Sequence, residues 1–555
     1  MREMLKKIIK NRILLLFILI IPTLSPLLKP GYFPMHDDIS AMRLLEVDKC
    51  LKDGQIPCRW VPDMGFGYGY PQFNYYAPLP YYLMEVFHLG GLGFLDSVKA
   101  GFVLSIIFSS LGMYLLARSL WGKQGGVLAA VLYAYLPYRA MDVYVRGAVG
   151  ELYAYAFLPF IFWSCREVLL GKKKGVLWLG LSLAALLTSH NITSMIFLPY
   201  LAAWIIFLLL RKKKSLLPDL KKRVVNLAVG VFWGFGLSAF FVLPAWFERN
   251  LVHINTLTGG YFGYLAHFVS FGQLFFYTYW GYGNSVAGPW DEASFTIGII
   301  HWTVAFLAIV LAYILKKRNK IPLVLFWVIA GLTSAFMAHS RSVFIWKAFP
   351  ITAFVQFPWR FLVLTGFSFS LAGGAIALFF PKGTKSFYYV LGLALMVIFF
   401  YAAFFKPLNW LDIKDEEKFS GDNWQKQQTV SIFDYLPVSA KEGPTSAAQV
   451  NPLVSLGKAG ILNWQKGTNW QRGKVRVEEN SQLKLPIYYF PNWEVRANGV
   501  EQEINYQDSL GLITFTLEPG EYDIEARLKN TPIRSFANII SFLGLIFIPL
   551  YLKKK

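Results

Sequence analysis

Residues 13–28 read ILLLFILIIPTLSPLL, an apolar run that follows directly on a basic N-terminus. No small-residue cleavage site follows, because the chain continues as Lys29-Pro30-Gly31-Tyr32, and we therefore predict an uncleaved first transmembrane helix. A helix needs roughly 20 residues to cross the hydrocarbon core, and fewer where neighbouring helices cover its ends. By this criterion we expect about 12 spans. The runs after the first are Ala100–Ala117, Gly125–Leu136, Leu152–Trp163, Gly175–Leu187, Ile192–Leu210, Val224–Phe247, Phe295–Leu315, Ile321–Met337, Phe361–Phe380, Ser386–Phe405 and Phe536–Leu552.

The composition favours lipid as the main solvent of this chain. Only 16% of the 555 residues are charged and 55% are hydrophobic, whereas soluble domains carry roughly 25% charged residues. The net charge of +21 does not indicate a nucleic-acid partner, because the basic residues form short clusters between apolar runs, as the positive-inside rule describes. Alternating spans place these clusters and both termini in the cytoplasm of a plasma or inner membrane. The clusters are Lys6/Lys7/Lys10/Arg12, Lys172–Lys174, Arg211–Lys214, Lys221–Arg223, Lys316–Lys320 and Lys553–Lys555.

The stretch before the last apolar run differs from the rest of the chain. Hydrophobic residues alternate with polar ones in Lys474–Val477, Ile513–Leu517 and Tyr522–Leu528, and Asn498-Gly499 and Pro519-Gly520 supply turn residues between such runs. We predict an extracytoplasmic antiparallel β-sandwich. The domains expected are therefore a transmembrane domain (1–405) with a long outer loop (29–99), a β-rich domain (406–534), and a final helix with a basic tail (535–555).

The outer loop 29–99 opens with His36-Asp37-Asp38, shortly after the first span. Carboxylates beside a bilayer are costly unless they are solvated, paired or metal-bound, which favours a functional role. The alternative is a solvated helix N-terminus, since Asp caps helices well. Helical spacing of apolar residues in 39–51 predicts an amphipathic helix along the membrane interface, and Cys50 and Cys58 fall in the same loop and could pair.

An apolar span, an acidic pair, an interfacial helix and an aromatic loop in this order resemble the GT-C glycosyltransferase superfamily. Within it, the chain resembles the membrane proteins called pyruvoyl-tetrahydropterin-synthase-related and, more distantly, the YfhO-like membrane proteins. The matching stretches are Met35–Asp38, Gly65–Pro71, Arg146–Glu151, Ser189–Asn191, Val242–Ala245, Gln356–Phe361, Asp434–Pro437, Tyr489–Trp493 and the Asn498-Gly499 turn. The seven His residues do not form the His-rich zinc site that a soluble pterin synthase needs.

The resemblance implies an inverting transfer of a sugar from a polyprenyl-phosphate donor to a glycan, lipid or protein acceptor outside the cell. It implies that Asp37 or Asp38 acts as general base or binds a divalent metal such as Mg²⁺ or Mn²⁺, with Asp37 as first choice, and that Glu151 is a further acid. For Glu151 the alternative is an ion pair with Arg146.

Cationic and polar residues in the same motifs are the expected substrate ligands. Arg146 and Arg360 suit a lipid phosphate, although Arg360 stands where a loop meets a span and could instead extend to the interface. His190 and Asn191 could bind a sugar hydroxyl or a metal, or form a structural hydrogen bond across a tight turn. His36 and Gln356 complete the predicted set, and Asp291-Glu292 is a weaker acidic pair.

Two other classes of protein fit parts of the sequence. A lipid or polysaccharide transporter or flippase would place charges in mid-span and interrupt matching helices in two related halves. A non-catalytic scaffold would bind envelope glycan with its outer loops and β-domain. The predicted spans carry almost no mid-helix charge and the acidic residues cluster on one side, which favours the enzyme.

Overall fold

The computed structural model describes residues 11–211, 219–288, 290–317, 319–381 and 383–553. Lys6, Lys7, Lys10, Lys212–Lys214, Arg318, Lys554 and Lys555 of the predicted basic clusters lie outside these ranges. The chain divides into two compact units. Unit 1 comprises Met1–Asp38, Leu95–Phe235 and Thr258–Asp412, and unit 2 comprises Ile39–Phe94, Gly236–Leu257 and Ile413–Lys555.

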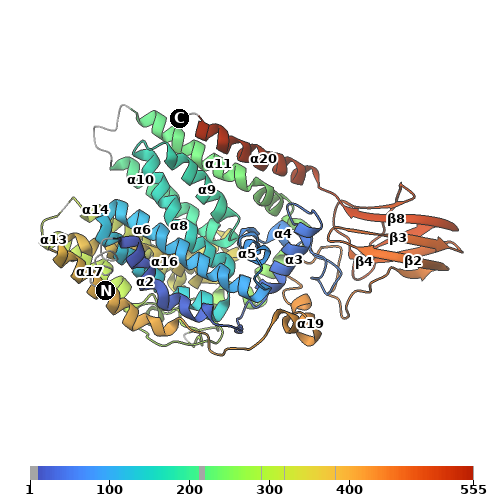
Figure 1. Cartoon of the computed structure of the whole chain (residues 1–555), viewed down its shortest axis with the longest axis horizontal. Helices are drawn as coiled ribbons and strands as arrows, with labels where there is room; N and C mark the ends of the chain where they lie inside the picture. The colour runs from blue at the N-terminus through green and yellow to red at the C-terminus, as the bar shows by residue number, and fades with distance from the viewer. Residues whose placement is uncertain (1–10, 212–218, 289, 318, 382, 554–555) are drawn as a thin grey trace. The chain divides into compact units, whose positions relative to one another are not determined.

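In the described residues of unit 1, the regular secondary structure is helical, with irregular stretches between the helices. Within it, α16 packs against α13 and α14, and α8 packs against α9 (Figure 1). The helix axis of α6 breaks at Gly122, whose backbone is not helical, and the two spans predicted in this region lie on either side of the break. The helices are α2 (Arg12–Leu24), α6 (Phe94–Ala134), α7 (Pro137–Met141), α8 (Val149–Leu169), α9 (Lys174–Leu187), α10 (Asn191–Leu210), α11 (Leu220–Phe247, continuing into unit 2), α12 (Phe271–Phe275), α13 (Ile299–Ile314), α14 (Ile321–Ala338), α15 (Val343–Ala348), α16 (Leu362–Gly374) and α17 (Thr384–Tyr401).

The apolar helices support a protein that crosses a membrane several times. Within the described ranges, six helical segments are long and apolar enough to span a bilayer, and four shorter apolar helices accompany them. The predicted helical membrane domain is therefore confirmed in kind. The total of 12 spans stays a prediction, because several of the predicted runs form helices shorter than a full crossing.

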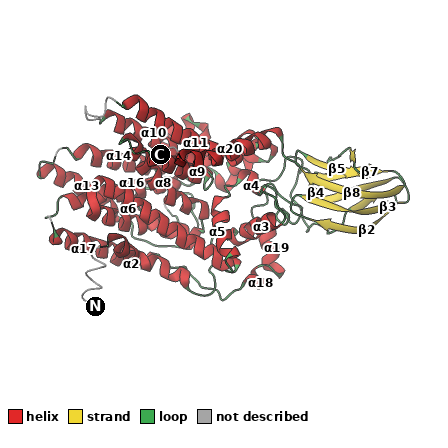
Figure 2. Ribbon diagram, turned by 45° about the horizontal axis from the view of Figure 1, so that its top comes forward, coloured by secondary structure: helices red, strands yellow, loops and turns green. Residues whose placement is uncertain are grey.

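Unit 2 combines helices with all of the described strands. The helices are α3 (Ser40–Lys52), α4 (Gln72–Tyr75), α5 (Leu79–Leu89), α18 (Asp415–Lys418), α19 (Gly421–Thr429) and α20 (Pro532–Lys553). The strands, yellow in Figure 2, are β1 (Leu453–Leu456), β2 (Ala459–Lys466), β3 (Trp470–Val477), β4 (Ser481–Tyr488), β5 (Trp493–Ala497), β6 (Val500–Gln502), β7 (Leu512–Leu517) and β8 (Gly520–Leu528). Every paired strand is antiparallel, in one sheet ordered β1-β4-β7 and another ordered β2-β3-β8-β5-β6.

The β-sheet domain predicted near the C-terminus is confirmed, whereas its description as a sandwich stays a prediction. The three alternating runs lie in β3, β7 and β8, and Asn498-Gly499 forms the turn between β5 and β6. The hydrophobic cluster of this domain is not made by the strands alone. It also takes in side chains from the first loop and from the segment that follows α11, namely Trp60, Phe66, Tyr68, Tyr75 and Val252. The first loop therefore supplies part of the core on which the strands pack.

The helix predicted after the acidic pair is α3, but its polar residues are not solvated as an interfacial helix would require. Arg43 is 5% exposed and Glu46 is fully buried. The Arg43 guanidinium lies 3.8 Å from the centre of the Tyr76 ring and donates to the Tyr81 hydroxyl. Other parts of unit 2 thus cover the face that we expected to contact water.

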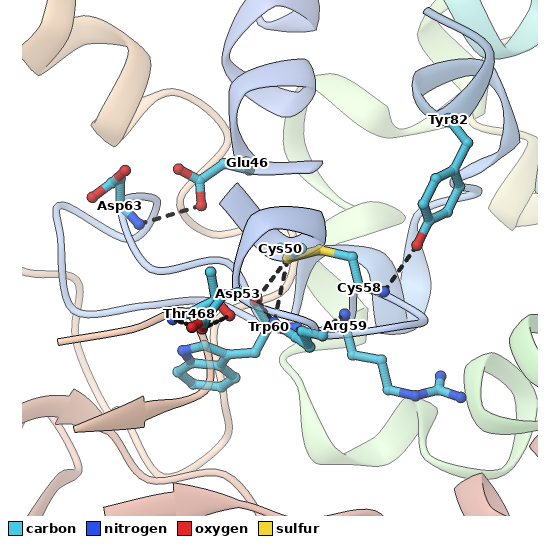
Figure 3. The surroundings of a disulfide bond; sticks show 10 residues. Glu46, Cys50, Asp53, Cys58, Arg59, Trp60, Asp63, Tyr82 and Thr468 are labelled. Atoms are coloured by element: carbon cyan, nitrogen blue, oxygen red, sulfur yellow. Dashed lines mark hydrogen bonds between the residues drawn. A yellow bond between two sulfur atoms is a disulfide. The ribbon is translucent and has the colours of Figure 1, made fainter. Parts of the chain in front are cut away.

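A disulfide joins Cys50 to Cys58 and closes a loop at the end of α3 (Figure 3). Asp53 in this loop accepts hydrogen bonds from the Thr468 main-chain N–H at 2.7 Å, the Thr468 hydroxyl at 2.6 Å and the Trp470 indole N–H at 2.9 Å. The closed loop is therefore tied to the turn between β2 and β3. The sequence left this pairing open, and the structure resolves it.

Candidate functional site

The candidate site in unit 1 is built on the turn between α7 and α8. A π-helical turn (Asp142–Arg146) follows α7 and ends at Gly147, which adopts the left-handed conformation with φ at 69°. A Cβ atom at Gly147 would lie 2.8 Å from the Met35 Sδ, so a side chain here would crowd the Met35 side chain just before the acidic pair. Glycine thus permits the close approach of the first loop to this turn.

Main-chain hydrogen bonds hold the acidic segment on the turn. The His36 N–H donates to the Val145 carbonyl at 3.0 Å, and the Asp37 N–H donates to the Arg146 carbonyl at 2.8 Å. The Asp37 side chain is exposed, and that of Asp38 is half-buried. The position of Asp37 is therefore fixed by its backbone while its carboxylate remains open to a ligand.

Arg146 lies at the centre of a buried network beneath this segment. Its Nη1 donates to Glu151 Oε2 at 2.8 Å, to the Tyr138 hydroxyl at 3.1 Å and to Asp142 Oδ1. The Tyr138 hydroxyl donates to Glu151 Oε1 at 2.8 Å, and the guanidinium lies 4.5 Å from the centre of the Trp359 ring. Arg146 is 6% exposed and both carboxylates are buried, so a single cation faces two acids in a dry environment.

Protonation of Asp142 would remove one of the two negative charges that face Arg146. Burial and the neighbouring Glu151 carboxylate raise the pKa of Asp142 well above its usual range. Asp142 Oδ2 is also buried without a hydrogen-bond partner. We infer that Asp142 holds its proton, which leaves Arg146 and Glu151 as a balanced ion pair.

These contacts bear directly on the predicted roles of Glu151 and Arg146. The ion pair that the sequence offered as the alternative for Glu151 is present, and both Glu151 oxygens are engaged. A role for Glu151 as a second acid or for Arg146 as a phosphate ligand stays a prediction, and either role requires these bonds to open. Sequence reasoning missed Tyr138 and Asp142, although Asp142 lies four residues before Arg146 on a turn and could have been paired with it.

Arg360 and Gln356 come together just before α16. Arg360 Nη1 donates to Gln356 Oε1 at 2.7 Å and to the Val355 carbonyl at 2.9 Å, while its buried Nε has no partner. Arg360 is half-buried and its guanidinium lies 5.0 Å from the centre of the Phe357 ring. One donor of the guanidinium is thus unused on a side chain that Gln356 holds in place.

His190 is positioned as a helix cap. As the N-cap of α10, its Nδ1 accepts from the Thr193 main-chain N–H at 3.3 Å and contacts the Thr193 hydroxyl at 2.7 Å. Burial lowers the pKa of His190 to about 3, so its ring is neutral. The structural hydrogen bond that the sequence offered as the alternative is therefore present, and Asn191 beside it is exposed. A sugar-binding or metal-binding role for either residue stays a prediction.

Negative groups surround Arg146. Although burial lowers it, the pKa of Arg146 is raised overall by Tyr138, Glu151, Asp142 and, least of these, Asp37. His36 Nε2 is hydrogen-bonded to the Tyr282 carbonyl at 2.9 Å. In the weaker acidic pair, Asp291-Glu292, the Asp291 carboxylate accepts hydrogen bonds from the Gln273 side-chain amide at 2.8 Å and from the Val286 N–H at 2.9 Å.

The divalent metal that the resemblance implies was predicted at Asp37 and Asp38. Across the described part of the chain, no group of three or more His, Cys, Asp and Glu side chains could hold a metal ion. Glu151 and Asp142 are directed to Arg146 rather than to Asp37. A divalent metal at Asp37 and Asp38 stays a prediction, and no step proposed below depends on one.

Comparisons with known proteins give limited similarities. No family model matches the chain. An uncharacterized protein of Lactococcus lactis subsp. cremoris is 26% identical over 242 residues, which is 42% of this chain and 38% of that protein. The resemblance to pyruvoyl-tetrahydropterin-synthase-related and YfhO-like proteins therefore stays a prediction.

Among solved structures, the Archaeoglobus fulgidus oligosaccharyltransferase in its apo form has a TM-score of 0.40 and 13% identity, over 78% of this chain and 60% of that one. The arabinofuranosyltransferase AftD from Mycobacteria has a TM-score of 0.40 and 10% identity, over 74% of this chain and 28% of that one. The A. fulgidus oligosaccharyltransferase AglB in complex with an inhibitory peptide and a dolichol-phosphate has a TM-score of 0.34 and 14% identity, over 80% of this chain and 61% of that one. The chain spans less than two thirds of each protein, and similarities of this size do not assign an activity.

Proposed function

We propose that this protein is a membrane glycosyltransferase of the GT-C type that transfers a sugar from a polyprenyl-phosphate donor to an extracytoplasmic acceptor with inversion. The observation that carries the proposal is the main-chain pairing of His36 and Asp37 with Val145 and Arg146. It sets the exposed Asp37 carboxylate on the turn that carries the buried Arg146, and a base opposite a cation is what a transfer from a phosphate leaving group needs.

In the proposed reaction, Asp37 takes the proton of the acceptor hydroxyl or amide as that group attacks the anomeric carbon. The bond between the anomeric carbon and the phosphate oxygen breaks, and the electron pair leaves with the lipid phosphate. The unused Nε of Arg360 is the donor that we assign to this phosphate, since a guanidinium suits phosphate geometry. Asp38 is the alternative base, because it adjoins Asp37 in the same segment.

The disulfide supports the proposed location of the reaction. Cys50 and Cys58 form a disulfide in the first loop (29–99), which also carries Asp37, and disulfides persist in oxidising compartments such as the periplasm or the cell exterior. An outer first loop agrees with the basic clusters on the opposite side of the predicted spans. The acceptor is accordingly proposed to be a glycan, lipid or protein of the cell envelope.

The experiment that tests the proposal uses purified full-length protein in liposomes with a panel of radiolabelled polyprenyl-phosphate sugars. We expect at least one donor to release its sugar in a protein-dependent manner and to transfer it to an envelope acceptor. A flippase would instead move a labelled donor between leaflets without cleaving it, so donor translocation is measured in the same preparations. Translocation of intact donor with no cleavage of any of them would reject the enzyme in favour of a transporter.

A further inference from the structure

A second possible ligand site in unit 1 is a cavity of about 300 Å³ at the ends of several apolar helices. It lies between the last residues of α8 and α10 and the first residues of α11 and α14, with one turn of α6 beside it. Four cationic side chains line it, namely Arg166, Arg211, Arg223 and Lys320, and the lining includes no carboxylate. The remainder of the lining is largely leucine and phenylalanine.

The cations are only partly neutralised by the protein. Arg166 lies 3.5 Å from Glu167, but Glu167 is shared with Lys172. Arg223 lies 3.9 Å from Asp219, whose side chain is 67% exposed. No hydrogen bond or ion pair involves the Lys320 ammonium within the described ranges of the chain. The cavity therefore carries a net positive charge.

Arg223 has a donor that the protein does not use. Its Nη1 donates to the Leu169 carbonyl at the end of α8 at 2.7 Å, which fixes the guanidinium at the cavity. Its side chain is 15% exposed, and its Nε is buried without a hydrogen-bond partner. A buried charged donor without a partner is costly, and an anion in the cavity would remove that cost. Arginines of a solvated topogenic cluster would have their donors in water instead.

The apolar part of the lining indicates which class of anion would fit the cavity. Leu169, Leu170 and Phe207 stand beside the cations, so the cavity offers hydrocarbon contact and positive charge together. The first turns of α11 and α14 add the partial positive charge of helix N-termini. Basic pockets between transmembrane helices on the cytoplasmic side are suited to acidic lipid head groups.

We propose that this cavity binds the phosphate of an anionic membrane phospholipid, with the acyl chain lying on the leucine and phenylalanine wall. Arg223 and Lys320 contact the phosphate, and Arg166 and Arg211 supply further positive charge. The site does not depend on the glycosyltransferase activity proposed above. Its residues belong to the basic end of the helices, whereas the transfer site is built from 35–37, 138–151 and 356–360.

The test measures binding of phosphatidylglycerol to the full-length protein in phosphatidylcholine nanodiscs by native mass spectrometry and by the shift in melting temperature. Wild-type protein is expected to retain phosphatidylglycerol over phosphatidylcholine. The double variant Arg223→Gln with Lys320→Gln should lose about 10- to 30-fold in apparent affinity, since each cation near a lipid surface contributes about 1 kcal/mol. Inorganic phosphate at the same concentration should not displace the lipid.

The matched control is Lys221→Gln with Lys222→Gln, which removes the same charge from exposed positions of α11 outside the cavity. It should retain phosphatidylglycerol within about twofold of wild type, because charges screened by water contribute little. The charge-conserving variant Arg223→Lys with Lys320→Arg separates loss of binding from loss of folding and should recover most of the affinity. Equal losses in the double variant and its control, or displacement by inorganic phosphate, would overturn the proposal.

Discussion

Arg146 compensates the buried carboxylates of unit 1. Arg146→Gln leaves the buried Glu151 carboxylate without its cation, and loss of one partner of a buried ion pair typically costs roughly 3–5 kcal/mol. We therefore expect a large fall in the melting temperature measured by scanning fluorimetry. The double variant Arg146→Gln with Glu151→Gln removes both charges and should be less destabilised than the single variant. Wild-type melting of Arg146→Gln would contradict the network.

Glu85 gives a pH-dependent prediction for unit 2. Burial and the nearby Asp48 raise its pKa to about 7, and both of its oxygens are buried without a hydrogen-bond partner. A raised pKa means that the folded state prefers the protonated acid, so its contribution to stability is complete below about pH 4.5 and is lost as the pH rises through 7. The wild-type melting temperature should fall between pH 5 and pH 8, and Glu85→Gln should reduce that fall. Parallel pH profiles for the two proteins would contradict this assignment.

Several residues of the candidate site could be predicted from the sequence and several could not. Asp37, Arg146 and Arg360 were expected in one site; main-chain bonds place Asp37 on the turn of Arg146, and a site shared with Arg360 stays a prediction. Asp142 and Tyr138 were missed because the role of a buried acid or hydroxyl depends on which hydrogen-bond partner the fold brings to it. The Glu151–Arg146 ion pair, in contrast, was open from the sequence as the alternative for Glu151, and the turn at Gly147 brings the two residues together.

At the scale of secondary-structure elements, the turn between α7 and α8 can be tested by substituting Gly147. Gly147→Ala must place a side chain at positive φ and at 2.8 Å from the Met35 Sδ, so it should shift the segment that carries Asp37. The φ penalty alone is about 1 kcal/mol. We expect reduced sugar transfer in addition to a lower melting temperature.

The control for this variant is Gly383→Ala, at a position with φ of 80° and no atom within 4 Å of the added Cβ. Its backbone, at φ 80° and ψ −144°, is at least as costly for a side chain as that of Gly147, but the added Cβ does not touch the first loop. Transfer should therefore remain near the wild-type rate in the control. A Gly147→Ala protein that keeps full transfer would show that the docking of the first loop on this turn is not needed.

The hydrophobic periodicity of the sequence predicted these strands and helices, but it did not predict which residues cover each of their faces. The alternating runs in β3, β7 and β8 have a clear period of two, and α3 has a helical one. The polar face of α3 was expected in water because Arg43, Glu46 and Lys49 are charged. Glu46 is instead fully buried and accepts from the Asp63 N–H at 3.4 Å. Tyr76 and Tyr81 of the same loop contact Arg43, and the period of a helix does not show which later residues will cover its polar face.

At the scale of the whole molecule, orientation in the membrane follows from charge and from the disulfide. Cysteines introduced at Ser446 and at Lys173 should differ, with only the first labelled by an impermeant maleimide added outside. Both positions are exposed, and the native cysteines give little background because Cys50 and Cys58 are paired and Cys165 is buried. Labelling of the Lys173→Cys protein from outside would reverse the predicted topology.

The feature hardest to predict from the sequence is which segments of the chain make up each of the two units. The predicted boundaries at 405 and 534 follow changes in hydropathy, whereas unit 2 gathers three separate stretches around one hydrophobic cluster. Trp60 and Tyr75 contribute to that cluster from almost 400 residues before the strands begin at Leu453. Hydropathy is a local property, and it contains no information on which distant segment fills a core.

The central claim is that a carboxylate of the first loop acts in sugar transfer. Asp37→Asn and Asp38→Asn keep the size of the side chain and the main-chain bonds to Val145 and Arg146, so folding should be preserved. We measure the transfer rate from a cleavable polyprenyl-phosphate donor and the melting temperature on the same preparations. One of the two variants should lose on the order of 10²–10⁴-fold in rate with an unchanged melting temperature, as expected on loss of a general base. Full transfer activity in both variants would remove the acidic pair from the mechanism and contradict the account.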